Sequence, residues 1–225
     1  MKKLLYILMA FVVLSCSDDD NQKTAEIPPD QKFVSMIDLS YAQLKFSYNA
    51  DNNITEVNLM NVESYNFEYE GNLIKTMNVF KGGQAKEYIF SYDNGIIVSM
   101  TVNGLATPII YNAAEKSYNN SIFLNEKGDI RKFINEGETS TYLYDMETKG
   151  VYTNTNNVNV YLLLAKIGGI FPVICNTHQV KTYHSEATLL ITPIYERDAN
   201  GFPTKITLDF LDETDFTGTF SYVQR

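Results

Sequence analysis

The sequence predicts a mainly β protein, an antiparallel up-and-down meander that forms a curved sheet or a partly open barrel. Three observations predict it: short runs in which aromatic residues alternate with polar ones, turns rich in Asn and Gly between the runs, and the recurrence of this combination. The length of 225 residues fits one domain, because large β domains often use a chain of this size as a single unit.

The alternation places aromatic side chains on one face of each predicted strand. Tyr65, Phe67 and Tyr69 alternate with polar residues, and residues 88–92 repeat the spacing with Tyr88, Phe90 and Tyr92. Successive side chains of a strand point to opposite faces, so a period of two gathers the aromatics on one of them.

Repeated units extend this pattern into a meander. Each unit has an aromatic-x-Tyr run, a polar turn that ends in Gly or Asn, and an apolar residue that begins the return strand. Tyr48, Tyr69 and Tyr92 are spaced 21 and 23 residues apart, the period of one hairpin plus its connection. The units are 46–57, 67–77 and 90–100, with weaker copies at 123–133 and 194–206.

Two dipeptides are predicted to form tight hairpin turns. Asn94-Gly95 and Asn200-Gly201 combine the residues that best tolerate the positive φ angles such turns require. A β-branched residue at Gly95 should therefore strain the backbone. We expect the same change at Gly137 to be milder, because residues 135–138 suggest a longer loop.

Residues 158–174 depart from the alternation. They are nearly all apolar, with Gly168-Gly169 and Pro172 as interruptions. The run fits either a short buried helix at about 159–167, which we favour, or a central pair of strands, since periodicity cannot assign a short apolar run. A helix here would cap the mouth of a barrel or fill its interior.

The N-terminus has the form of a lipoprotein signal peptide. Two lysines precede an apolar run from Leu4 to Val13, which at about ten residues is too short to span a bilayer. Val13-Leu14-Ser15-Cys16 resembles a bacterial lipobox, which implies that residues 1–15 are removed and that Cys16 carries a thioether-linked lipid. An ordinary secretory peptide with a chance Cys is the alternative.

A polar tether at 16–32 follows the lipobox, and the β domain occupies 33–225. Ser17, Asp18, Asp19 and Asp20 directly after Cys16 resemble the surface-export signal of Bacteroidetes lipoproteins, with a plain solvated linker as the alternative. Removing residues 1–15 takes away two of the 18 basic residues against 27 acidic ones, which leaves a net charge of −11. That charge opposes docking on anionic lipid, so the acyl chains must supply the anchor.

The repeats resemble the YD-type repeats of bacterial surface and RHS proteins, most closely at Tyr92-Asp93-Asn94-Gly95-Ile96. With the anchor, the chain resembles lipoproteins of gut Bacteroidetes that carry a domain of unknown function described as porin-like. The similarity covers about 46–145 and 188–223. It implies a β fold and a place at the outer membrane, exposed on the cell surface.

Cys175, His178 and His184 are weak candidates for a metal site, because they gather the remaining thiol and both histidines within ten residues. Tetrahedral zinc requires three or four closed protein ligands, and a second Cys pair is absent from the sequence. On a regular strand the two histidines would face one way and Cys175 the other. A Cys–His nucleophile has no orienting Asp nearby in sequence. If Cys16 carries the lipid, Cys175 has no Cys to form an intramolecular disulfide with.

Other chemistry finds little support in the sequence. Carboxylates crowd the last quarter of the chain, where a glycosidase pair or a calcium site is conceivable, but charge on exposed strands that blocks edge pairing explains them better. No P-loop, GxGxxG, HExxH or GxSxG motif occurs. The acidic balance argues against nucleic-acid binding. We expect no cofactor.

We therefore expect a non-catalytic surface lipoprotein of the outer membrane that binds a glycan, a small ligand or an outer-membrane protein partner. The alternative is a carrier of lipid or another hydrophobic ligand, with an apolar cavity inside a barrel. A hydrolase comes third.

Overall fold

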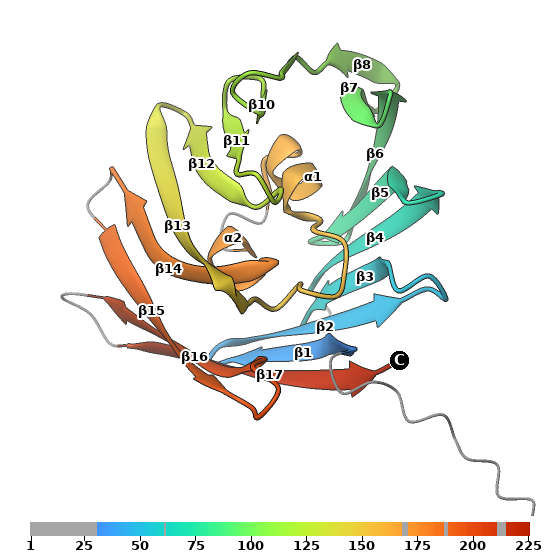
Figure 1. Ribbon diagram of the computed structural model, residues 1–225. Coiled ribbons are helices and arrows are strands. Elements are labelled where there is room, and N and C mark those ends of the chain that lie inside the picture. Colours follow the sequence, from blue (N-terminus) through green and yellow to red (C-terminus); the bar gives the residue numbers. More distant parts are fainter. Residues whose placement is uncertain (1–30, 61, 168–170, 187–188, 211–214) are drawn as a thin grey trace, which may run out of the picture.

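The computed structural model describes residues 31–60, 62–167, 171–186, 189–210 and 215–225. One antiparallel sheet of 17 strands curves around two short helices (Figure 1). This confirms the predicted meander. The predictions for the signal peptide and for Cys16 to Asp20 concern residues outside the described ranges. Within the described ranges, no helix has the length and apolar character needed to cross a bilayer.

The first nine strands lie in the first half of the chain and the other eight in the second half. They are β1 Lys32–Leu39, β2 Ala42–Tyr48, β3 Ile54–Leu59, β4 Glu63–Glu70, β5 Leu73–Lys81, β6 Gln84–Asp93, β7 Ile96–Val102, β8 Leu105–Pro108, β9 Tyr111–Asn112, β10 Ser117–Tyr118, β11 Ile122–Leu124, β12 Ile130–Asn135, β13 Glu138–Lys149, β14 His178–Ser185, β15 Leu189–Arg197, β16 Pro203–Phe210 and β17 Phe216–Gln224.

Strand pairing follows the chain almost throughout. Each strand except β8 and β9 pairs with both of its neighbours in sequence, and β17 pairs with β1, which brings the two ends of the domain together. β8 and β9 do not pair with each other, so the sheet is not closed there. At this seam Ile109 donates its amide to the Val98 carbonyl, and Ile110 accepts from the Asn119 amide, each at 2.8 Å.

The alternation of the sequence becomes an apolar interior and a polar exterior. On β4, Tyr65 and Phe67 belong to the buried core, whereas Glu68 is exposed on the other face. Lys45 and Ser47 are exposed in the same way on β2, beside the buried Phe46. The sheet therefore has one apolar face, turned toward the two helices.

A β-bulge recurs at the same place in the repeated units. In β4–β5, Glu68 faces Thr76 while Tyr69 faces Ile74, so Lys75 is the extra residue. The extra residue follows a buried Val or Ile in most copies. Those copies are Ser35, Thr55, Lys75, Val98, Arg131 and Lys181, and Thr204 is the extra residue after Pro203.

The Tyr of each unit reaches the carbonyl just before a bulge. The β3–β4 ladder ends at Glu56 and Asn66, so no strand partner meets the Ile54 carbonyl, and the Tyr69 hydroxyl donates to it at 2.7 Å. The same contact joins Tyr48 to Val34, Tyr92 to Ile74 and Tyr144 to Ile130, at 2.5–2.7 Å. Tyr118 and Tyr195 likewise hydrogen-bond the backbones of Ile97 and Val180. Tyrosine hydroxyls thus replace ladder bonds where neighbouring units separate.

Two turns differ from the expectation. Asn94 and Gly95 both have positive φ, as a primed turn requires, but Asn200 does not, because Asp198 to Phe202 form a longer loop. Gly137 has φ of +90° and follows Glu136 at +53°, between the paired residues Asn135 and Glu138. That turn has only two residues, so it is as tight as the turn at Gly95. The expected longer loop was wrong, so the reason for a milder effect at Gly137 no longer holds.

Residues 150–167 and 171–177, which we call the interior segment, lie inside the curve of the sheet between β13 and β14 (Figure 1). They hold α1 Asn159–Leu164 and α2 Phe171–Ile174, whose Leu162, Phe171 and Ile174 are buried. The predicted helix is confirmed from Asn159 and ends earlier than expected. Lys166 adopts φ of +58°, and the Ile167 amide bonds to the Leu162 carbonyl, which closes the last turn as a Schellman motif.

We predict that Tyr69→Phe destabilises the fold. The change keeps the ring but leaves the buried Ile54 carbonyl without a donor, at a cost of about 1–3 kcal/mol. The melting temperature should fall by roughly 2–10 °C, as measured by circular dichroism. Tyr41→Phe is the matched control, because Tyr41 is 68% exposed. Equal melting temperatures for the two variants would contradict this role of the hydroxyl.

Candidate functional site

The three candidate metal ligands, Cys175, His178 and His184, have different environments in the structure. Cys175 is fully buried, and burial raises the pKa of its thiol to about 12. It is a core side chain that stays protonated at neutral pH, so it lacks the thiolate that nucleophilic or metal chemistry needs.

His178 and His184 do not share a face of β14, contrary to the expectation from a regular strand. The β13–β14 register skips Lys181, and this bulge reverses the alternation between the two histidines. Tyr183 packs its ring against the buried Tyr142, and His184 is exposed on the other side. Across the described ranges, no three His, Cys, Asp or Glu side chains gather into a group that could hold a metal ion.

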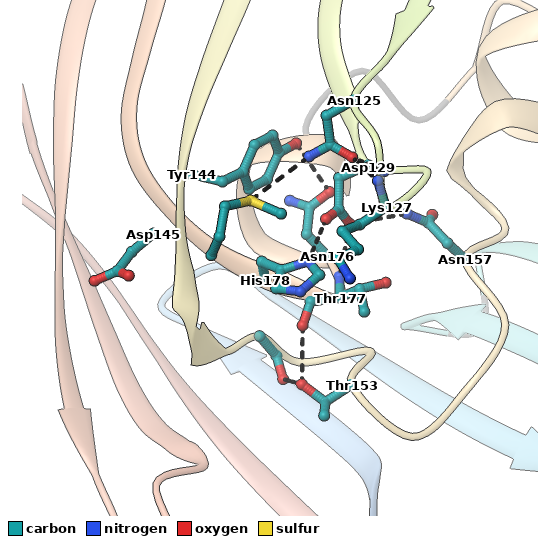
Figure 2. Close-up of polar contacts among 12 residues, drawn as sticks. Asn125, Lys127, Asp129, Tyr144, Asp145, Thr153, Asn157, Asn176, Thr177 and His178 are labelled. Atoms are coloured by element: carbon teal, nitrogen blue, oxygen red, sulfur yellow. Dashed lines mark hydrogen bonds and ion pairs between the residues drawn. The ribbon is translucent and has the colours of Figure 1, made fainter. Parts of the chain in front are cut away.

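His178 instead belongs to a polar cluster around Asp129 (Figure 2). The Asp129 carboxylate is fully buried and lies 2.6 Å from the His178 Nδ1. The same carboxylate accepts the Thr177 backbone amide at 3.0 Å and the Asn157 side-chain amide at 3.5 Å. Tyr144 stands beside the cluster, with its hydroxyl 3.3 Å from Asn176 Oδ1. These donors satisfy a carboxylate that would otherwise be costly to bury.

A five-residue loop places Asp129 in this position. Asn125 Oδ1 accepts the amides of Lys127 and Asp129, and Gly128 takes φ of +86°. Two other loops repeat these bonds, Asn49–Asn53 and Asp198–Phe202. In all three the fifth residue is buried, as Asn53, Asp129 or Phe202.

The three loops contact residues 149–156 and 176–178, where the interior segment leaves and rejoins the sheet. We call these residues the neck. Asn53 accepts a hydrogen bond from Asn156, Asp129 binds Thr177 and His178, and the Lys149 ammonium lies 4.4 Å from the centre of the Phe202 ring. The cluster around Asp129 therefore fixes the neck to the sheet, and we call it the clamp. Its described side chains do not include a nucleophile paired with a base.

Gly150 fits the same neck. A Cβ at this position would lie 2.2 Å from the Asn176 carbonyl oxygen, while the Gly150 amide donates to Thr177 at 2.9 Å. Two backbone segments approach too closely here for any side chain. The sequence analysis predicted neither the contacts around Asp129 nor the close approach at Gly150. The recurring Asn-x-x-Gly-x and Asp-x-x-Gly-x patterns in the sequence could have indicated the loop that positions Asp129.

The carboxylates of the last quarter are spread over the surface. Glu196 pairs with Lys205 at 2.8 Å on the outside of β15 and β16, and Asp198 pairs with Lys32 at 2.5 Å. Asp209 and Asp215 are exposed, and Asp212 and Glu213 lie outside the described residues. The described members do not form the facing pair that a glycosidase requires.

A surface cleft of about 420 Å³ opens between β5 and β6. The ladder between these strands stops at Thr76 and Ile89, so residues 73–75 and 90–92 diverge. Leu73 and Ile89 give the cleft apolar walls, and Ser91 contributes a hydroxyl. Glu70 and Lys75, which are also among its walls, form an ion pair of 2.6 Å. A second cavity of about 200 Å³ lies beside α1 and β12.

Comparison with known proteins gives no family assignment. No family model matches the chain, and no curated protein matches it. Among solved structures, the chain is similar to a porin-like protein from Bacteroides uniformis, with 12% identity, a TM-score of 0.45, and coverage of 84% of this chain and 96% of that one. It is also similar to a porin-like protein from Bacteroides vulgatus, with 12% identity, a TM-score of 0.43, and coverage of 85% and 99%.

We predict that Asp129→Asn loosens the neck. An amide cannot accept from all the donors that surround the carboxylate, so the free energy of unfolding should fall by about 1–3 kcal/mol. Hydrogen exchange at the Thr177 amide should accelerate as well. Asp51→Asn is the control, because Asp51 is an exposed residue of the equivalent loop. If the Thr177 amide exchanges as slowly in Asp129→Asn as in the native chain, the proposed role of Asp129 in fixing the neck is wrong.

Proposed function

We propose that the protein is a lipid-anchored lipoprotein of the outer membrane, exposed on the cell surface, which binds a small polar ligand such as a short glycan and does not catalyse a reaction. The observation that carries the binding role is the cleft between β5 and β6. Its volume of about 420 Å³ lies in the range of about 300–1,000 Å³ that is typical of ligand pockets.

The walls of the cleft suit a sugar. Leu73 and Ile89 offer apolar surface to the C–H face of a ring, while Glu70, Lys75 and Ser91 can bond its hydroxyl groups. Hydrogen bonding to Lys75 and its positive charge lower the pKa of the Glu70 carboxyl, so Glu70 is an acceptor at neutral pH and has no proton to give as a general acid.

The apolar core of the described residues weighs against the carrier hypothesis. The side chains of α1 and α2, among them Leu162, Phe171 and Ile174, pack with the inner face of the sheet in one core. A hydrophobic ligand would have to displace this core. We therefore prefer a ligand site on the outer face.

The polarity of the outer face supports an anchor that is separate from the sheet. Lys45, Ser47 and Glu68 are exposed on neighbouring strands, whereas strands that face lipid present apolar side chains outward. A lipid on Cys16 would hold the domain at the membrane, and Ser17 with Asp18, Asp19 and Asp20 would direct it to the cell surface.

The anchor is tested by Cys16→Ala, which removes the sulfur that would carry the lipid. We expect the variant to lose incorporation of labelled fatty acid and to leave the membrane fraction. Asp18→Ala, Asp19→Ala and Asp20→Ala together should keep the lipid but reduce labelling on whole cells. A Cys16→Ala protein that still incorporates fatty acid would refute the anchor.

The ligand site is tested with a glycan array and then by calorimetry on the strongest ligand. Glu70→Ala combined with Lys75→Ala should weaken binding about tenfold or more, since each removes a charged hydrogen-bond partner. Glu196→Ala with Lys205→Ala is the matched control, because this ion pair is also exposed but lies outside the cleft. Equal affinities for the two double variants would exclude the cleft.

A further inference from the structure

Several large apolar side chains are exposed at one end of the sheet. Tyr41, Met60 and Val62 occupy turns, with exposed fractions of 68%, 52% and 69%, and Phe80 lies one residue from the end of β5 at 48%. We call these four residues the apolar rim. The Phe216 ring packs 5.2 Å from Tyr41 and continues the row.

The strand register brings these residues together. The turns after β1, β3 and β5 lie at the same end of the meander, because each is separated from the next by two antiparallel strands. Met60 donates its amide to the Gln43 carbonyl at 3.0 Å, which links the first two turns. Lys81 bonds to Glu63 at 3.0 Å, which links the second turn to the third.

The opposite end of the sheet carries many acidic residues, although Ile110 is also exposed there. Its turns and loops include Asp51, Glu70, Asp93, Glu126 and Asp198. In contrast, the sequence places no charged residue in the turns 40–41, 60–62 and 82–83 at the other end. Carboxylates avoid a low-dielectric surface. Those at the rim's end of the sheet, among them Asp215, Glu138 and Glu186, lie on other strands, so the tips of β1 to β6 are the part of this end best suited to approach lipid.

We propose that the apolar rim rests in the interfacial region of the membrane that carries the anchor. This inference depends on the proposed lipidation of Cys16. The four side chains form a row on turn tips, which cannot enclose a small molecule. A stable protein interface buries about 800 Å² on each partner, more than so few side chains provide. A domain that its anchor already holds at the bilayer needs only a weak contact, because its effective concentration there is high.

The length of the tether permits this orientation. Residues 16–31 number 16 and can span about 50–58 Å when extended. They join β1 at Lys32, which lies at the acidic end, and the eight residues of β1 cover about 26 Å. The tether can therefore run from the bilayer past the whole length of β1. The cleft between β5 and β6, which includes Glu70, then faces away from the membrane.

The absence of Trp from the sequence makes a direct test available, since each introduced Trp is the sole one. The lipidated mature chain carrying Tyr41→Trp or Phe80→Trp is placed in vesicles of phosphatidylethanolamine and phosphatidylglycerol with brominated acyl chains. We expect blue-shifted emission that is quenched several-fold relative to vesicles with unbrominated lipid. Asn72→Trp, in an exposed turn at the acidic end, is the control and should not be quenched.

The outcomes separate the inference from the proposed function. Mass spectrometry of the N-terminal peptide reports whether Cys16 carries lipid, and a chain without it refutes the anchor. A lipidated, vesicle-bound Tyr41→Trp protein with equal emission in the two kinds of vesicle overturns the inference alone. Blue-shifted emission that depends on protein density but not on bromination would show a second copy on the rim, and also overturns it. Adding Val62→Ser and Met60→Ser to Phe80→Trp should reduce the quenching.

Discussion

The hydrogen bond from a tyrosine hydroxyl to the carbonyl before a bulge is the interaction on which the rest of the structure depends. A buried carbonyl without a donor is costly. Ladders between neighbouring units stop short of one end, as at Glu56 and Asn66, and would leave carbonyls such as that of Ile54 unpaired. The Tyr69 hydroxyl supplies the missing donor and its ring fills the space between the strands. The sheet can therefore separate at that end without losing hydrogen bonds.

The separation explains where the interior segment enters. The five-residue loops lie at the end where the units diverge, and their last residues point inward as Asn53, Asp129 and Phe202. The same five-residue loop geometry thus presents three different groups to the neck: the amide of Asn53, the carboxylate of Asp129 and the ring of Phe202. Asp129 contributes most of the polar contacts, because it is the charged member and is fully buried. The helices beyond the neck complete the apolar core that the sheet alone leaves open.

Local features of this fold could be predicted from the sequence, and long-range ones could not. The alternation around Tyr69 and the positive φ at Gly95 depend on neighbouring residues, so both were predicted. Asp129 meets His178 across 49 residues, and no local pattern reports such a contact. The faces of His178 and His184 were mistaken, because a bulge at Lys181 reverses the period of two. Tyr144 makes the same hydroxyl contact as the other repeat tyrosines. The interior segment follows it where the other units have a short turn, so the sequence pattern did not reveal it as a member of the repeat.

The bulge also shows how a repeated scaffold can hold one specific site. Lys75, Thr55 and Val98 occupy the same backbone position on three return strands, and the chemistry of their side chains differs completely. The cation at this position in β5 pairs with Glu70 at 2.6 Å, whereas Arg131, the cation at the same position in β12, pairs with Glu115 at 3.5 Å. The hydroxyl contacts that shape the sheet are common to the units, whereas the side chains at the bulge vary from unit to unit. The proposed ligand site of the β5–β6 cleft therefore draws its charge pair from a residue that varies along a repeated backbone.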